Sequence, residues 1–218
     1  MSIRRTVPVR IPVSGIDLAL SGDLTSSEAD TGLVIFAHGS GSSRMSPRNR
    51  AVAAALAQAG LATLLLDLLT EPEAANRANV FDIPLLAARV AGAVDWACAE
   101  PRHAGRRIGL FGASTGAAAA LVAAADRRED VGAVVSRGGR PDLAGDALEL
   151  VVAPTLLIVG GADHAVIGLN EEAYARLRCE KRLAIVPGAT HLFEEPGTLE
   201  AVTGLAADWF TFHLARSL

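Results

Sequence analysis

The chain has 218 residues, half of them hydrophobic, and a formal net charge of −4 from 20 basic and 24 acidic side chains. This length favours a single domain over residues 1–218 with a substantial core. The slightly acidic balance lacks the basic surface of a nucleic-acid-binding protein, and no run approaches the roughly 18 apolar residues that a membrane span needs.

The N-terminus and the two cysteines indicate the compartment and the metal chemistry. Arg4 and Arg5 are not followed by the apolar stretch of a signal peptide, so we expect a cytoplasmic protein. Cys98 and Cys179 lie far apart and form no C-x-x-C pattern. Two cysteines do not make a zinc site alone, and their spacing does not indicate a disulfide. We expect no metal and no organic cofactor.

Hydrophobic patterning predicts a sheet of mainly parallel strands. Residues Thr6–Leu24 alternate apolar and polar around Ser14-Gly15, which is typical of an antiparallel hairpin with one face in water. Strands that are buried on both faces read as continuous apolar runs. The runs of this kind are Gly32–Ala37, Leu61–Leu66, Arg107–Phe111, Val131–Ser136, Pro154–Val159 and Arg182–Val186.

Helices are predicted between these runs. They are Ala51–Ala59, Phe81–Ala99, Ala117–Ala125, Leu169–Leu177 and a final helix from about Pro196 to Leu214. Ser46 and Pro47 suit the N-cap and first position of the first helix. Leu68–Asn79 is predicted as a long loop, and Arg137–Ala153 is the one place for a lid. The order predicts a three-layer α/β fold with an N-terminal antiparallel hairpin and no large cap domain.

A G-x-S-x-G pattern, Gly112-Ala113-Ser114-Thr115-Gly116, joins a predicted strand to a predicted helix. In this context the pattern is typical of a nucleophile elbow, where the serine lies at the tip of a strained turn. The glycines leave room because a side chain would collide with the adjacent strand or helix. We predict Ser114 as the nucleophile; the alternative is a glycine-rich turn with an idle serine.

The loop His38-Gly39-Ser40-Gly41 follows an early central strand, where a serine hydrolase places half of its oxyanion hole. We predict the backbone N–H of Ser40 as one donor and the N–H of Thr115 as the other. The alternative for this loop is a plain Gly/Ser turn. We interpret His38 as a structural hydrogen-bonding residue without a catalytic role.

Ser114, Asp163 and His191 each follow the end of a predicted parallel strand, in that order along the chain. This order and placement are typical of the α/β-hydrolase triad. His191 would take the serine proton and return it to the leaving group, and Asp163 would orient the imidazole. Asp142 and His164 are alternatives that we weigh less, because Asp142 follows an earlier strand and His164 precedes the last one.

Three arginines are candidates for substrate binding. Arg44 and Arg48 lie near the start of the first predicted helix, where they could attract an anionic substrate; solvated arginines at a helix start are the equal alternative. Arg137 follows a strand whose end faces the same edge of the sheet. A structural salt bridge is an equally good interpretation of Arg137.

These motifs, together with Gly161-Ala162-Asp163 and Gly188-Ala189-Thr190-His191-Leu192-Phe193, resemble those of dienelactone-hydrolase-type α/β hydrolases. The resemblance covers nearly the whole chain and implies a small, capless domain. Dienelactone hydrolases proper use a cysteine nucleophile where this chain has Ser114, which favours a general carboxylesterase over a lactonase. Residues 38–44 and 136–141 also resemble a bacterial hydrolase branch whose members are sometimes fused to a phosphoribosyltransferase domain. We expect no second domain here.

The sequence thus predicts a serine hydrolase that cleaves small carboxylic esters through an acyl-serine intermediate. Its partner would be a small-molecule ester, with no nucleic acid and no membrane, and the protein would be a monomer or a homodimer. The same machinery could act on thioesters, lactones or amides, or in acyl transfer. A second alternative is a non-catalytic binding protein with this fold.

Overall fold

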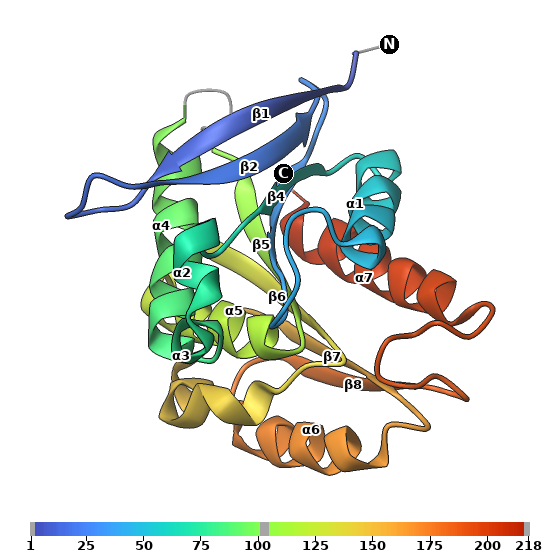
Figure 1. Cartoon of the computed structure of the whole chain (residues 1–218). Helices are drawn as coiled ribbons and strands as arrows, with labels where there is room; N and C mark the ends of the chain where they lie inside the picture. The colour runs from blue at the N-terminus through green and yellow to red at the C-terminus, as the bar shows by residue number, and fades with distance from the viewer. Residues whose placement is uncertain (1–2, 101–104, 216–218) are drawn as a thin grey trace.

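A computed structural model describes residues 3–100 and 105–215 of the chain. Its centre is an eight-stranded sheet with the order β1-β2-β4-β3-β5-β6-β7-β8 (Figure 1). The strands are β1 Arg5–Pro12, β2 Ala19–Ser26, β3 Gly32–Ala37, β4 Ala62–Leu66, β5 Arg107–Ala113, β6 Val131–Arg137, β7 Thr155–Gly160 and β8 Lys181–Val186. Strand β2 is antiparallel to β1 and to β4, and the remaining pairs are parallel.

Helices cover both faces of the sheet, which confirms the predicted three layers, and residues 3–100 and 105–215 form no large cap domain. The helical elements are α1 Pro47–Gln58, α2 Glu71–Ala75, α3 Arg77–Val80, α4 Ile83–Ala99, α5 Thr115–Asp126, the 3-10 segment η2 Pro141–Leu150, α6 His164–Arg176 and α7 Thr198–Leu214. Helices α1 and α7 pack on one face, and α4, α5 and α6 lie on the other (Figure 1). None of these described helices has the length and apolar character needed to cross a membrane.

The apolar runs form the strands because two helical layers remove both sheet faces from water. Every residue of β3, β4 and β7 is buried. Helix α5 lies against the sheet along its length, and its alanines Ala117–Ala120 are fully buried. Small side chains let this helix approach the strands closely, which brings the residue before it, Ser114, to the edge of the sheet.

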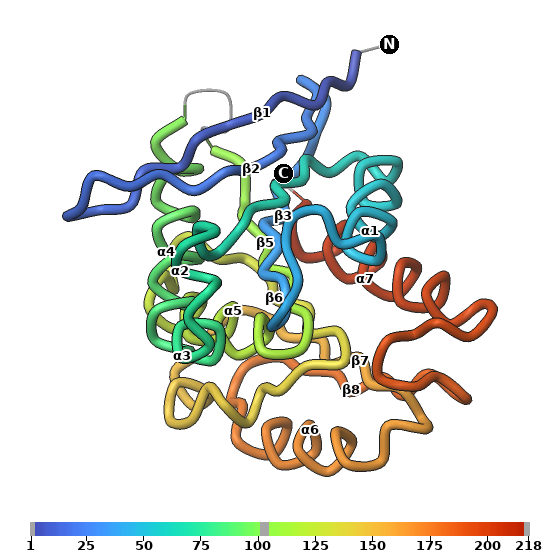
Figure 2. Tube along the Cα trace, viewed as in Figure 1, coloured from blue at the N-terminus to red at the C-terminus, as the bar shows by residue number. Residues whose placement is uncertain are grey.

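Three predicted elements differ from the structure. Strand β2 begins at Ala19 rather than near Ile16, which is exposed in the connection from β1; Figure 2 shows the tip of this hairpin projecting past α4. Helix α6 begins at His164, five residues before the predicted start, so that Asp163 occupies its N-cap position. The predicted loop 68–79 contains α2 and α3, and a capping box between Thr70 and Glu73 stabilises the start of α2.

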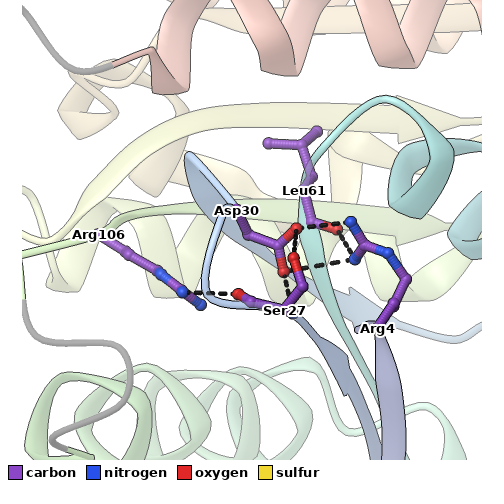
Figure 3. Close-up of polar contacts among 5 residues, drawn as sticks. All are labelled: Arg4, Ser27, Asp30, Leu61 and Arg106. Atoms are coloured by element: carbon purple, nitrogen blue, oxygen red, sulfur yellow. Dashed lines mark hydrogen bonds and ion pairs between the residues drawn. The ribbon is translucent and has the colours of Figure 1, made fainter. Parts of the chain in front are cut away.

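The buried carboxylate of Asp30 is hydrogen-bonded to Arg4, the residue that precedes β1 (Figure 3). Asp30, which is 7% exposed, accepts hydrogen bonds from the Arg4 guanidinium at 2.6 Å and from the backbone N–H of Ser27 at 2.6 Å. Arg4 also donates to the carbonyl of Leu61, and Arg106 donates to the carbonyl of Ser27. These bonds satisfy a carboxylate that would otherwise be costly to bury, and they link the residue before β1 to residues that precede β3 and β4.

Candidate active site

The G-x-S-x-G turn holds its serine in a strained conformation. Ser114 lies between β5 and α5 with φ 51° and ψ −124°, a positive φ that side-chain-bearing residues rarely adopt. The loop at residues 137–140 fixes this conformation on both sides of the serine. The Ser114 N–H donates to the carbonyl of Arg137 at 3.3 Å, and the Ser114 carbonyl accepts from the N–H of Arg140 at 3.0 Å. Asn170 in turn donates to the carbonyl of Gly139.

Asp163 and His191 form a hydrogen-bonded pair across two loops of the same sheet edge. Asp163 follows β7 and His191 follows β8, and Asp163 Oδ2 lies 2.7 Å from His191 Nδ1. A carboxylate partner places the proton on Nδ1, which leaves Nε2 as the basic nitrogen of the neutral imidazole. The Asp163 side chain is 13% exposed and that of His191 is 39% exposed, so the imidazole is open to a ligand while its partner is covered.

The loop at residues 137–140 also approaches the histidine. A Cβ built on Gly138 would lie 3.0 Å from the carbonyl oxygen of His191 and 3.7 Å from its Cε1 atom. The same loop therefore hydrogen-bonds to the backbone of Ser114 and passes close to His191. The hydroxyl of Ser114 makes no hydrogen bond within residues 3–100 and 105–215. Catalytic hydrogen bonds often tighten only when a substrate is bound.

Asp142 and His164, the alternative acid and base of the sequence analysis, take no part in the pair formed by Asp163 and His191. Asp142 is held by Arg140, whose Nε and Nη2 atoms donate to its two oxygens at 2.9 and 2.7 Å. His164 is exposed at the first position of α6. The geometry therefore pairs His191 with Asp163. Among the residues that the structure describes, no three His, Cys, Asp or Glu side chains are grouped so that they could hold a metal ion.

The two predicted oxyanion donors lie on adjacent segments. The backbone N–H of Ser40, in the loop after β3, donates to the side-chain Oγ1 of Thr115 at 3.0 Å. Thr115 is the first residue of α5, so its own N–H has no acceptor within the helix. A Cβ built on Gly39 would lie 2.9 Å from the Cβ of Ser114, so the loop after β3 rests directly on the serine. Sequence reasoning did not foresee the contact of the Thr115 side chain.

His38 holds the loop in the orientation that turns the Ser40 N–H inward. The N–H of Leu68 donates to His38 Nε2 at 3.1 Å, so the ring proton is on Nδ1, which donates to the carbonyl of Gly39 at 2.9 Å. The C=O and N–H of one planar trans peptide point in opposite directions. Fixing the Gly39 carbonyl therefore aims the Ser40 N–H toward Thr115. Burial lowers the pKa of His38, against smaller raising effects of the Gly39 bond and Asp67, and keeps it neutral.

The three candidate substrate-binding arginines differ in their partners. Arg44 forms ion pairs with Asp67 and, at 3.5 Å, with Asp23. Arg48 pairs with Glu194 at 3.0 Å.

Arg137 is 7% exposed and has no carboxylate partner among the described residues. Its Nη2 donates to Asn49 Oδ1 at 3.4 Å, while its Nε and Nη1 atoms are buried without a hydrogen-bond partner. Burial, together with the positive charge of Arg48, lowers the pKa of Arg137 to about 10.

A cavity of about 370 Å³ opens beside the loop after β3. Its lining is residues 38–44, Asp67, Leu69, Glu71, Ala74, Val80 and Leu86. The apolar side chains of the wall are Leu69 in the connection after β4, Ala74 in α2, Val80 in α3 and Leu86 in α4. The segment predicted as a loop at 68–79 is thus one wall of the cavity, and the Thr70-x-x-Glu73 pattern was the signal that could have indicated its structure.

Sequence and structure comparisons show which known proteins this chain resembles. The model of the dienelactone hydrolase family matches residues 24–208. The crystal structure of a dienelactone hydrolase from Anabaena variabilis is 56% identical, covers 97% of this chain and 99% of its own, and superposes with a TM-score of 0.93. Est1E from Butyrivibrio proteoclasticus shares the fold with a TM-score of 0.80 at 19% identity, over 96% of this chain and 99% of its own.

Two curated proteins of Mycobacterium tuberculosis, from strains CDC 1551 / Oshkosh and H37Rv, are each 63% identical to this chain over 195 residues. Both are provisionally named as phosphoribosyl transferases. The match covers 89% of this chain but 44% of each relative, so the chain spans less than half of their length.

Proposed function

The chain belongs to the dienelactone hydrolase family and is a hydrolase, and on that premise we propose that it cleaves small carboxylic esters through an acyl-serine intermediate. The observation that carries the proposal is the strained Ser114 at the end of β5, held by a loop that also passes close to His191, which is hydrogen-bonded to Asp163. Such strain persists where the surrounding structure maintains it and is concentrated at functional sites.

In the proposed reaction, Ser114 Oγ attacks the ester carbonyl carbon while His191 Nε2 takes the serine proton. The carbonyl π electrons move onto oxygen, where the N–H groups of Ser40 and Thr115 stabilise the negative charge. Collapse of this intermediate breaks the bond to the alkoxy oxygen, which leaves as the alcohol with the proton from His191. Water then attacks the acyl-serine with His191 as base, which releases the acid and restores Ser114. Asp163 stabilises the imidazolium throughout.

Labelling with a fluorophosphonate tests the proposal. We expect intact-mass measurement to show one phosphonyl group on the wild type, added with loss of fluoride, and none on Ser114→Ala. Hydrolysis of matched ester, thioester, lactone and amide substrates then separates the proposed esterase from the same triad acting on other acyl groups. A folded wild type that takes no phosphonyl group would contradict the proposal and favour a non-catalytic binding protein.

Phosphoribosyl transfer, the activity in the name of the mycobacterial relatives, is not proposed for this chain. Those relatives are more than twice as long as the matched part, and the family model that covers residues 24–208 is a hydrolase family. An elbow serine with a His–Asp pair supplies the chemistry of acyl transfer. Phosphoribosyl pyrophosphate should therefore remain unchanged in the same assays.

Of the arginines proposed to contact an anionic substrate group, Arg137 has the best support. Arg44 and Arg48 already have carboxylate partners and would have to exchange them for a substrate. A buried guanidinium without a carboxylate, such as that of Arg137, carries an uncompensated desolvation cost that an anionic group would offset.

The cavity beside Gly39 and Ser40 is the proposed binding pocket for the apolar part of the ester. Leu69, Val80 and Leu86 form the apolar part of its wall. The Ala74→Trp substitution in α2 should fill part of it and lower kcat/KM for a p-nitrophenyl octanoate at least about tenfold, with p-nitrophenyl acetate nearly unaffected. Ala75→Trp, on the same helix but outside the cavity lining, is the matched control. Equal losses for both esters would place the acyl chain elsewhere.

A further inference from the structure

The side chain of Thr115 lies at the predicted oxyanion hole, and the proposed mechanism does not use it. Thr115 is 5% exposed, and its Oγ1 atom accepts the hydrogen bond of the Ser40 N–H at 3.0 Å. One predicted donor is therefore directed at this hydroxyl, and the other predicted donor is the backbone N–H of the same residue. An oxyanion that accepted both N–H groups would therefore form beside this hydroxyl.

A hydroxyl that accepts a hydrogen bond retains a proton to donate. Across residues 3–100 and 105–215, the Thr115 hydroxyl donates no hydrogen bond. Other threonines of the chain donate to carbonyls, as Thr203 does to Glu200 and Thr155 does to Ala153. A buried hydroxyl proton without an acceptor is unfavourable, and an oxygen atom of a bound substrate would satisfy it.

From this geometry we propose that the Thr115 hydroxyl is a third donor of the oxyanion hole, which rests on the proposed ester hydrolysis. When Ser114 Oγ bonds to the carbonyl carbon, the oxygen gains negative charge and accepts the N–H groups of Ser40 and Thr115 and the O–H of Thr115. The Ser40 N–H exchanges its resting acceptor, Thr115 Oγ1, for the oxyanion. Thr115 keeps its proton throughout, so only hydrogen bonds change.

The hydrogen bond between Ser40 and Thr115 has one alternative interpretation, and the two interpretations predict opposite changes in kcat when the hydroxyl is removed. If the hydroxyl merely competes with the oxyanion for the Ser40 N–H, its removal frees that donor and leaves kcat unchanged or higher. If the hydroxyl donates in the transition state, its removal lowers kcat, because an interaction that strengthens as charge develops is lost.

The test compares Thr115→Val, which keeps the shape but removes the hydroxyl, with Thr115→Ser, which keeps the hydroxyl. We expect kcat for p-nitrophenyl butyrate to fall about 10- to 100-fold in Thr115→Val with KM nearly constant, and to stay within about threefold of wild type in Thr115→Ser. Thr203→Val, on the exposed side of α7, is the matched control and should retain wild-type kinetics. If Thr115→Val melts below the assay temperature, Thr115→Ala serves in its place.

A tetrahedral inhibitor gives a second readout. Phenylboronic acid forms a tetrahedral adduct on the serine, so its inhibition constant should rise in Thr115→Val by about the factor by which kcat/KM falls. An active wild type with unimpaired Thr115→Val kinetics and unchanged boronate inhibition would overturn the third donor alone. A wild type that neither hydrolyses esters nor takes a phosphonyl group would overturn the proposed function and this inference together.

Discussion

Replacing Ser114 with alanine is expected to lower kcat/KM for ester hydrolysis by at least about 10⁴-fold, close to the rate in buffer. The reason is that no other group at the elbow can form the acyl intermediate. Cys98 and Cys179 are far from it in the fold: Cys98 lies on α4 beside Asp130, and Cys179 lies before β8 beside Thr155. Hydrolysis of p-nitrophenyl butyrate by purified wild type and Ser114→Ala, with a buffer blank, measures the effect.

The fold should survive this substitution. The Ser114 side chain makes no hydrogen bond among the described residues, and its backbone bonds to Arg137 and Arg140 do not depend on the hydroxyl. The thermal midpoints of the two proteins should therefore agree within about 3 °C, since losing a hydroxyl that makes no hydrogen bond, with the Cβ kept, is expected to change stability by less than about 0.5 kcal/mol. Substantial activity in the folded alanine variant would contradict the assignment of Ser114 as nucleophile.

The second large effect is expected on folding. Helix α5 approaches the end of β3 so closely that a Cβ on Gly116 would lie 2.2 Å from the carbonyl oxygen of Ala37 and 2.5 Å from that of His38. Both are backbone atoms, so the end of β3 and the loop that follows it must move together. Gly116→Ala should lower the free energy of unfolding by about 3 kcal/mol or more, measured by urea titration. It should also abolish ester hydrolysis, because the Ser40 N–H is displaced.

A matched glycine distinguishes this clash from the general effect of adding a methyl group. A Cβ on Gly92, within α4, would meet nothing within 4 Å. Gly92→Ala should therefore be neutral or stabilising by about 0.5–1 kcal/mol, as glycine is unfavourable in a helix. Equal stability of the two alanine variants would show that the close approach at Gly116 is not a constraint.

Much of the fold could be read from short stretches of the chain. Helix α1 begins after Ser46, whose side chain accepts the Asn49 N–H, and Gly60 follows its end with φ 87°. The continuous apolar run Gly32–Ala37 is a strand with the predicted bounds. These features depend on backbone preferences and on burial of each element in its own layer, so neighbours in sequence determine them. The capping box formed by Thr70 and Glu73 is equally local.

In the candidate site, too, some features depend on residues that are neighbours in sequence and others on the packing of the whole domain. The serine turn is local, because Gly112, Ser114 and Gly116 must lie within five residues to form the elbow. The order of Ser114, Asp163 and His191 placed each residue after a strand, and parallel strands end at one edge of a sheet. The sequence by itself therefore determined which residues reach that edge.

The order along the chain also predicted that Asp163 pairs with His191, and the structure has this hydrogen bond. Only the tertiary structure decided the contact of Ser40 with the Thr115 side chain, which spans 75 residues, and that of Arg48 with Glu194, which spans 146. A hydrogen bond requires an approach of about 3 Å, and the strand order and helix packing of the whole domain set such distances. The local sequence pattern places each of these residues at the edge of the sheet. The packing of the three layers then sets which side chains come close enough to form a hydrogen bond.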